Sequence, residues 1–193
     1  MKKNINIFLD LDNTLIWSLD IDKVKKKDPR LKQFKNHEMK DNYIIFERPG
    51  LQRFLNWIFK HFNVSIWSAG SPDYVEFIAK NIVENNKRQL HYVLNSDNCE
   101  ESQEIYGDNH IKQLDLLWDE HDIKGYSKLD TLIIDDLTKV IKENYTNSIR
   151  IKKFIARKSS INDIEFKIIK KKLISIKKHY NRNINKPGFK LLK

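Results

Sequence analysis

An apolar run near the start of the chain ends in two closely spaced acids. Ile5 to Leu11 favours a buried strand, because the run is short, rich in Ile, Phe and Leu, and followed by polar turn-formers. Asp10 and Asp12 lie at its end, and open α/β sheets bind their ligands at the carboxyl ends of parallel strands. An ordinary Asp/Asn turn explains the same residues. A calcium loop does not, because its sixth position is Leu where that loop requires Gly. Asp20 and Asp22 repeat the spacing without a preceding apolar strand and are interpreted as surface charges.

Further along the chain, predicted strands alternate with predicted helices. Pro49 to Phe62 places its apolar residues on one face of a helix, and Ser71 followed by Pro72 is a typical helix start. Ser18 to Asp41 and Glu84 to His110 are predicted to be irregular. The remaining predicted elements are strands at Val64 to Trp67, Thr131 to Ile134 and Ile151 to Ile155, and a helix at Ile111 to Glu120. This alternation predicts a three-layer α/β fold, in which a mainly parallel central sheet is covered by helices on both faces.

Three further features stand at positions comparable to that of the two acids. Ser68 ends the second predicted strand just before a helix start, where backbone N–H groups and the helix dipole favour an anion. Asp135 and Asp136 end the third predicted strand, and Lys112 lies at the start of a predicted helix among polar neighbours. Taken one at a time, these features have ordinary alternatives, namely a helix-entry serine, a turn and a surface lysine.

Length and cysteine content limit the class of protein. A chain of 193 residues suits one compact domain, and we expect a single domain over residues 1–193. The single Cys99 excludes an internal disulfide and a Cys-rich zinc site, which is typical of a reducing compartment, so we expect the nucleus or the cytoplasm. Polar residues interrupt the N-terminal apolar run too early for a signal peptide, and no stretch approaches the roughly 18 apolar residues of a membrane span.

The basic residues of the chain are concentrated towards its C-terminal end. Residues 150–193 contain 15 Lys and Arg against two acids, whereas the whole chain carries a net charge of +10. A helix predicted to begin near Asn162, with Glu165 as its capping partner, presents a dense lysine face and an apolar stripe. The stripe consists of Phe166, Ile169, Leu173, Ile176 and Tyr180. We interpret residues 162–193 as a basic helix and tail, whose charged face is either simply solvated or attracts phosphorylated protein, nucleic acid or another polyanion.

The order of these features resembles the four motifs of the haloacid dehalogenase superfamily. Asp-x-Asp-x-Thr follows the first strand, Ser follows the next, a Lys comes third, and Asp-Asp follows a later strand. More narrowly, the chain resembles the small carboxy-terminal-domain phosphatases and their larger relatives, which dephosphorylate the repeat tail of RNA polymerase II. Phe46 to Leu51 looks like the Arg-Pro-Gly helix entry of that family. Asp108 to Leu114 looks like its Lys motif, and Asn162 to Glu165 looks like the start of its last helix. The resemblance covers nearly the whole chain.

The resemblance implies a fold with a small cap or none, and a chemical role for each motif. Asp10 would be the nucleophile that forms an aspartyl-phosphate, and Asp12 the general acid and base. Mg²⁺ would be held by Asp10, the Asp12 carbonyl and Asp136, with Asp135 orienting its waters. The phosphate would be contacted by residues from three of the motifs, namely Thr14, Ser68, Ala69 and Lys112.

The function implied by the resemblance is that of a protein serine/threonine phosphatase acting on phosphorylated protein. Two alternatives stay open: a phosphatase for nucleic-acid 3′ ends, which the basic tail would suit, and a catalytically silent phosphopeptide-binding module. The chain departs from the family in lacking Ser-Pro after the fourth motif, in carrying Tyr106-Gly107 where small relatives have an Arg, and in the basic composition of Ser18 to Asp41. All the motif acids are present, which favours an enzyme over a silent module.

Overall fold

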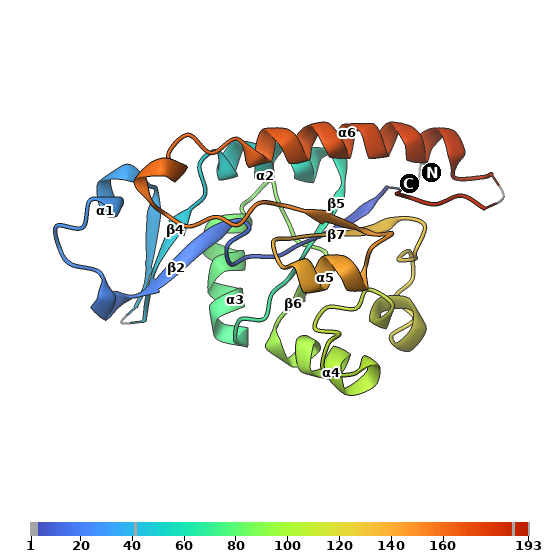
Figure 1. Ribbon diagram of the computed structural model, residues 1–193, viewed down its shortest axis with the longest axis horizontal. Coiled ribbons are helices and arrows are strands. Elements are labelled where there is room, and N and C mark those ends of the chain that lie inside the picture. The colour runs from blue at the N-terminus through green and yellow to red at the C-terminus, as the bar shows by residue number, and fades with distance from the viewer. Residues whose placement is uncertain (1–3, 41, 187, 193) are drawn as a thin grey trace.

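A five-stranded parallel sheet forms the centre of the protein. The computed structural model describes residues 4–40, 42–186 and 188–192, and its strands lie in the order β6-β5-β1-β7-β8 (Figure 1). These strands are β1 (Asn6–Leu9), β5 (Asn63–Trp67), β6 (Val93–Leu94), β7 (Thr131–Asp135) and β8 (Ser148–Arg150). Since β1 pairs in parallel with both β5 and β7, the carboxyl ends of these three strands lie next to one another on the same side of the sheet, called its carboxyl edge below.

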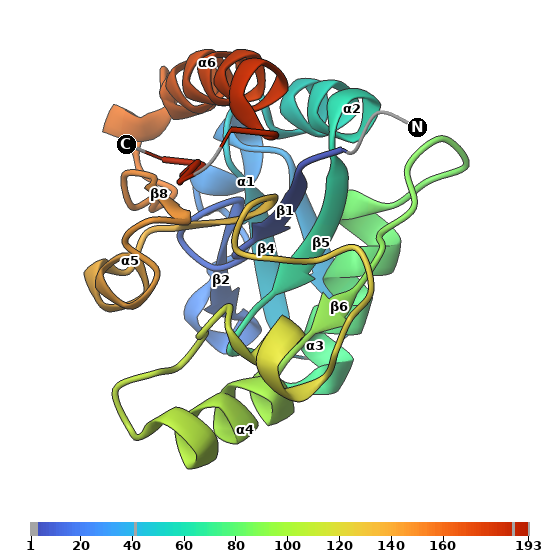
Figure 2. The ribbon, with the colours of Figure 1, turned by 90° about the vertical axis from the view of Figure 1, so that its right-hand side faces the viewer.

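Helices cover both faces of this sheet, as the alternating pattern predicted. Helices α2 (Leu51–His61), α3 (Pro72–Ile78) and α6 (Glu165–Asn183) share a core with the side chains on one face of β1. Helices α4 (Ser96–Tyr106) and α5 (Thr138–Glu143) contribute to a second core around Phe8 and Trp67 on the opposite face. Figure 2 shows α2 and α6 side by side above the sheet. The predicted three-layer α/β fold is therefore confirmed.

A second, smaller sheet lies beyond the carboxyl edge of the parallel one. It is antiparallel, in the order β2-β4-β3, and its strands are β2 (Ile16–Asp20), β3 (Asn36–Met39) and β4 (Tyr43–Glu47). The short helix α1 (Arg30–Gln33) precedes β3, and Phe34, Ile44 and Phe46 form part of a separate small core. The prediction that Ser18 to Asp41 is irregular is thus wrong over β2, α1 and β3. The polar β3 sequence shows little alternation and is held in place by its pairing with β4.

Other predicted boundaries also need correction. The predicted fourth strand lies three residues earlier, at β8 (Ser148–Arg150). Ile151 to Ile155 belongs to no strand, and its backbone donates from Ile151 to the Asp135 carbonyl at 3.0 Å and from Phe154 to the Asn13 carbonyl at 2.6 Å. Glu84 to His110, predicted to be irregular, contains α4, whose start is fixed by reciprocal capping between Asn95 and Asn98. Ile111 to Glu120 is not a regular helix, because only its last five residues form a wide helical turn.

Two helix starts differ from the predicted capping. Helix α6 begins at Glu165, and Asp163 rather than Asn162 accepts its amide hydrogen bond, at 2.9 Å. The Glu165 side chain accepts a hydrogen bond from the Lys152 amide and not, as predicted, from the backbone at the start of its own helix. Helix α3 begins at Pro72 as predicted, but Ser71 makes no capping hydrogen bond. In the part of the chain that the structure describes, every helix is too short or too polar to cross a membrane.

Candidate active site

Adjacent strand ends bring the predicted acids and the serine to one edge of the sheet. Asp10 directly follows β1, Ser68 directly follows β5, and Asp135 is the last residue of β7. Because β1 lies between the other two strands, the side chains that leave these ends surround a common space. All three residues are buried, with Asp135 fully inaccessible to solvent.

The turn after β1 separates the two acids of the first motif. The chain leaves the strand after Leu9, and the amides of Thr14 and Leu15 return to the Leu11 carbonyl at 3.2 and 2.8 Å. Asn13 stands at the tightest point with φ of 62°, a left-handed conformation that Asn tolerates better than most residues. Strand alternation alone would have pointed Asp10 and Asp12 the same way, and this turn lets them occupy different surroundings.

Lys112 is the internal cation of the site. Its ammonium donates to Asp10 at 2.6 Å and to Asp135 at 2.8 Å, and the side chain is 1% exposed. Asn144 fixes the backbone around it by donating to the Lys112 carbonyl and accepting from the Leu114 amide. Although burial opposes a charged lysine, the two carboxylates raise the pKa of Lys112, so the ammonium stays charged.

Asp10 is held in a strongly perturbed environment. Burial and, less strongly, the neighbouring Asp135 raise the pKa of Asp10, while Lys112 lowers it, and the balance of these effects is a pKa of about 7. One of its oxygens accepts from Lys112, while the other, Oδ2, is buried and accepts no hydrogen bond within the described residues. That oxygen is the one with lone pairs available for a metal ion or an electrophile.

Three carboxylates form a group that fits a hard divalent cation. Asp10, Asp135 and Asp136 each offer an oxygen, and these oxygens lie within 4.8 Å of one another. Asp135 already accepts from Lys112 and from the Leu137 amide, whereas no side chain among the described residues hydrogen-bonds to Asp136. Burial and the nearby Asp135 raise the pKa of Asp136. An all-oxygen set of this kind suits Mg²⁺, with Asp10 and Asp136 better placed than Asp135 to contact it directly.

Asp12 lies outside this acidic group and has its own partner. Its Oδ1 accepts a hydrogen bond of 2.6 Å from the Tyr74 hydroxyl, which also contacts the Ser18 hydroxyl. Burial raises the pKa of Asp12, and the Tyr74 hydrogen bond and Lys112 lower it. Tyr74 was not predicted as a site residue, since from the sequence it is only an aromatic residue in the first turn of α3, next to Val75. Asp12 is thus a carboxyl whose protonation is controlled separately from that of Asp10.

We expect Tyr74→Phe to lower kcat for a phosphomonoester about tenfold. A hydrogen bond to a charged group contributes roughly 1.5 kcal/mol or more, which corresponds to about a factor of ten in rate. The hydroxyl lowers the Asp12 pKa, so its removal raises that pKa and should move the Asp12-dependent limb of the pH–rate profile to higher pH. Tyr145→Phe, which removes a hydroxyl from a side chain that is 77% exposed, is the matched control. A profile identical to that of the control would contradict this role.

The remaining predicted phosphate contacts occupy two loops. The Ser68 hydroxyl accepts from the Gly70 amide at 3.1 Å, and Ala69 between them is exposed. A side chain at Gly70 would place its Cβ 2.6 Å from the Tyr74 ring, so the absence of one lets this loop and the ring pack together. Thr14 is fully buried beside Asp10, and its hydroxyl lowers the Asp10 pKa. The structure therefore brings Ser68 and Thr14 to the site from different strand ends.

Arg48 ties together the segments behind the site. Its fully buried guanidinium donates to the Thr14 carbonyl at 3.0 Å, to the Lys152 carbonyl at 2.7 Å and to both oxygens of Asp163 at 3.1 and 2.9 Å. The rings of Phe154 and Phe166 each lie 5.5 Å from it. The Arg-Pro-Gly motif was noted from the sequence, but nothing in the sequence indicated that Arg48 joins the first motif to the start of α6.

Comparison with known proteins places the chain in a family. The model of the family described as NLI interacting factor-like phosphatase matches residues 5–183. The chain belongs to this family. The family resemblance inferred from the ordered motifs is therefore confirmed, and the aspartate group at the strand ends fits the active site of such a phosphatase.

Two viral proteins are similar to this chain over most of their length. The CTD phosphatase-like protein 355R of Invertebrate iridescent virus 6 is 36% identical over 186 residues, which cover 93% of this chain and 99% of that protein. Its namesake in Invertebrate iridescent virus 3 is 40% identical over 182 residues, which cover 89% of this chain and 96% of that protein.

Solved structures of Fcp1, an RNA polymerase II CTD phosphatase, share the fold. One has a TM-score of 0.60 and 20% identity, covering 99% of this chain and 58% of that chain. Another, the fission yeast enzyme bound to beryllium fluoride, has a TM-score of 0.56 and 21% identity, covering 90% of this chain and 50% of that chain. The chain thus spans little more than half the length of these structures.

Proposed function

We propose that the protein is a magnesium-dependent phosphomonoesterase that works through an aspartyl-phosphate on Asp10. The observation that carries the proposal is the buried Asp10 carboxylate, which has a free Oδ2, a lysine ammonium at 2.6 Å and two further acids within metal-binding distance. A nucleophile, a cation and a metal site meet at one point, which is the arrangement that phosphoryl transfer requires.

The first half of the reaction uses Asp10 and Asp12 in different roles. Asp10 Oδ2 attacks phosphorus, the bond between phosphorus and the leaving oxygen breaks, and Asp12 gives its proton to that oxygen. Lys112, which already favours the ionised form of Asp10, neutralises negative charge beside the incoming phosphate. The Ser68 hydroxyl and the exposed backbone at Ala69 contact the remaining phosphate oxygens.

The second half regenerates the carboxylate. Asp12, now ionised, removes a proton from water, the water oxygen bonds to phosphorus, and the bond from phosphorus to Asp10 breaks to release inorganic phosphate. Tyr74 positions Asp12 in both halves through its 2.6 Å hydrogen bond. Asp10 and Asp136, together with Asp135, would hold Mg²⁺, which would supply positive charge to offset the repulsion between the acids and the phosphate.

A phosphorylated protein is the substrate class that we favour. The viral relatives are named as CTD phosphatase-like proteins, and Fcp1, whose structure shares the fold, is an RNA polymerase II CTD phosphatase. The antiparallel sheet lies beside the carboxyl ends of the parallel strands (Figure 1), so an extended phosphoserine- or phosphothreonine-containing segment that reaches Asp10 would pass close to it. Small metabolites are usually closed off from water during such chemistry, which favours phosphate carried on a macromolecule here.

Hydrolysis of a generic aryl phosphate tests the proposed chemistry. We expect turnover with Mg²⁺, its loss in EDTA, and recovery when Mg²⁺ is restored. Activity that persists without a divalent metal would contradict the mechanism, and phosphopeptide binding without turnover would indicate a silent module. A panel of phosphoserine and phosphothreonine peptides and 3′-phosphorylated oligonucleotides then tests the substrate class. Selective cleavage of the oligonucleotides would replace the protein substrate by a nucleic-acid end.

A further inference from the structure

A pocket that is remote from the catalytic acids opens between two helices. It has a volume of about 170 Å³ and lies between the N-terminal halves of α2 and α6. The stacked rings of Phe54 and Phe166, with centroids 4.4 Å apart and planes within 9°, line it together with Trp57. Because Phe54 and Phe166 cover each other and are only 4% and 7% exposed, the half-buried Trp57 is the ring of this pocket on which a flat, unsaturated occupant can stack.

Cations surround this aromatic pocket. Arg53, Lys167 and Lys170 contribute to its lining, and the Lys170 ammonium lies 4.9 Å from the centre of the Trp57 ring. Among its lining residues the one acid is Asp163, whose carboxylate already accepts from Arg48 and from the Glu165 amide. The pocket therefore presents positive charge to a ligand. A ligand with an apolar ring and an attached anion fits such a pocket better than a neutral apolar ligand does.

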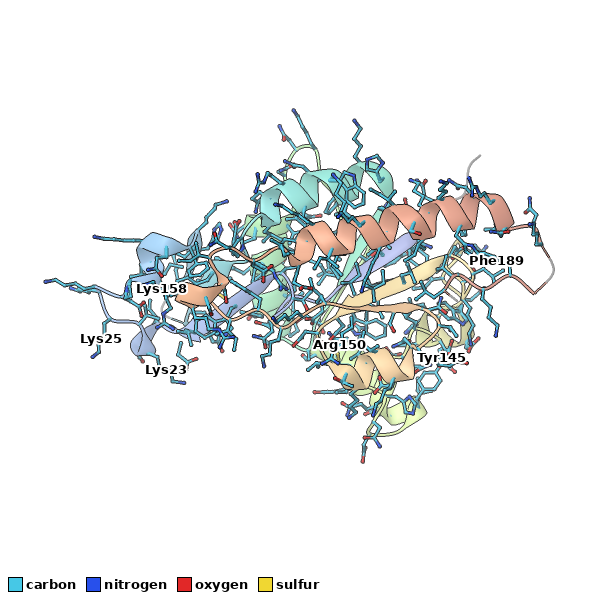
Figure 3. All side chains as sticks on the ribbon, turned by 45° about the horizontal axis from the view of Figure 1, so that its top comes forward. Lys23, Lys25, Tyr145, Arg150, Lys158 and Phe189 are labelled. Atoms are coloured by element: carbon cyan, nitrogen blue, oxygen red, sulfur yellow. The ribbon has the colours of Figure 1, made fainter. Side chains whose placement is uncertain are left out.

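The positive charge continues along the outer side of both helices. Helix α2 contains no acidic residue, and α6 contains one, Glu165, in its first turn. Exposed cations of this α2–α6 surface are Arg53, Lys60, Lys167, Lys170, Lys171, Lys178 and Arg182. The 19 residues of α6 span about 28 Å, so the cations form an extended row rather than a point site. Figure 3 shows α6 as one long, continuous helix with side chains projecting from it.

The positive charge of this surface also acts on a neighbouring histidine. Burial lowers the pKa of His61, and the nearby Lys177, Lys60 and Lys170 lower it further.

We propose that the α2–α6 surface binds single-stranded nucleic acid. One base enters the aromatic pocket beside Trp57, and the phosphates on either side follow the cations of α6. A duplex fits less well, because its bases are stacked on both faces and cannot enter the pocket. An acidic protein segment could pair with the lysines but offers no base for the pocket. The binding is independent of hydrolysis at Asp10 and requires neither metal nor turnover.

The charge contribution is tested with a labelled oligonucleotide. Fluorescence anisotropy with a fluorescein-labelled 20-nucleotide oligo(dT), measured from 50 to 300 mM KCl, gives the affinity and its salt dependence. The triple variant Lys167→Gln/Lys170→Gln/Lys171→Gln should bind at least about tenfold more weakly at low salt. Its log–log salt slope should be smaller by about two, because each lost phosphate contact on a single strand contributes about 0.7.

The matched control removes the same charge elsewhere. Lys25→Gln/Lys26→Gln/Lys27→Gln alters three exposed lysines in one loop, and Figure 3 shows Lys25 projecting away from α6. We expect this variant to bind within about twofold of wild type, and both triple variants to keep the wild-type melting temperature. Equal losses from the two triple variants would mean that binding reflects net charge alone, and would overturn the proposal.

The pocket is tested separately at Trp57. Trp57→Leu should weaken oligo(dT) binding about tenfold with an unchanged salt slope, and Trp57→Phe should recover most of the affinity, because a ring remains for stacking. Two results would overturn the proposal even if the lysine variants behave as expected. One is equal affinity for a duplex of the same length, and the other is competition by poly-glutamate as effective as that by unlabelled oligo(dT), which would identify an acidic protein as the partner.

Discussion

Replacing Asp10 with Asn is expected to reduce kcat for an aryl phosphate by at least about 10⁴-fold. An amide cannot form the acyl phosphate, and the loss of a covalent nucleophile typically removes most of the rate enhancement of an enzyme. The measurement is kcat at saturating substrate and Mg²⁺, with inorganic phosphate as the product detected. Asp22→Asn is the matched control, because it makes the same change in the exposed repeat of the Asp-x-Asp pattern and should leave the rate unaffected.

The same variant separates catalysis from folding. The pKa of Asp10 is 3.8 in the unfolded chain and about 7 in the folded protein, so folding favours the protonated carboxyl. This protonation stabilises the fold fully below pH 3.8, and the stabilisation is lost as the pH rises through about 7. Asparagine does not titrate and carries no such penalty. Lys112 also keeps Asp135 as an ion-pair partner at 2.8 Å when Asp10 is replaced. We therefore expect the metal-free variant to melt close to wild type at pH 8. Retention of near-wild-type turnover would show that another residue is the nucleophile.

Arg48→Met should lower the free energy of unfolding by about 3–5 kcal/mol, which is the usual cost of removing one partner from a buried ion pair. The change leaves the Thr14 and Lys152 carbonyls without their donor and removes the partner of Asp163, which is 13% exposed. Urea unfolding followed by circular dichroism measures the loss. Because Arg48 contacts neither Asp10 nor Asp12, the fraction that stays folded should retain activity in proportion.

Arg53→Met is the comparison for this prediction. Arg53 lies five residues further along the chain, on an exposed part of α2, and surface charge substitutions usually change stability by less than about 0.5 kcal/mol. If Arg48→Met and Arg53→Met lowered stability equally, the hydrogen bonds of Arg48 would not hold the first motif to the start of α6.

The strand ends were predictable because their signals are local. A buried strand such as β1 or β7 is a short apolar run that stops abruptly, so Asp10 and Asp135 could be placed at an edge of a parallel sheet without knowledge of the contacts. The parallel pairing of β1 with β5 and with β7 then brings the ends of these strands together. The same reasoning misplaced β8 by three residues, since Ile151 to Ile155 has a similar apolar content but no strand beside it.

The partners of the catalytic residues were not predictable in this way. Tyr74 reaches Asp12 and Asn144 fixes the backbone of Lys112 only because segments far apart in the sequence meet in the folded protein. Helix α4 was missed because its sequence is largely polar and lacks a clear apolar stripe, and its start depends on a pair of asparagines. The contacts of Tyr74 and Asn144 are tertiary, and composition and periodicity do not encode them, whereas the capping of α4 is local but gives no periodic signal.

Lys112 also affects how the protein behaves when magnesium is scarce. Its single positive charge lies between Asp10 and Asp135 and contacts both. The protein thus carries a built-in counter-ion, and the acidic strand ends need not repel one another while no divalent ion is bound. The fold would then tolerate repeated loss and return of the metal. If turnover depends on magnesium as proposed, a shortage of the metal would stop catalysis while the protein stays folded.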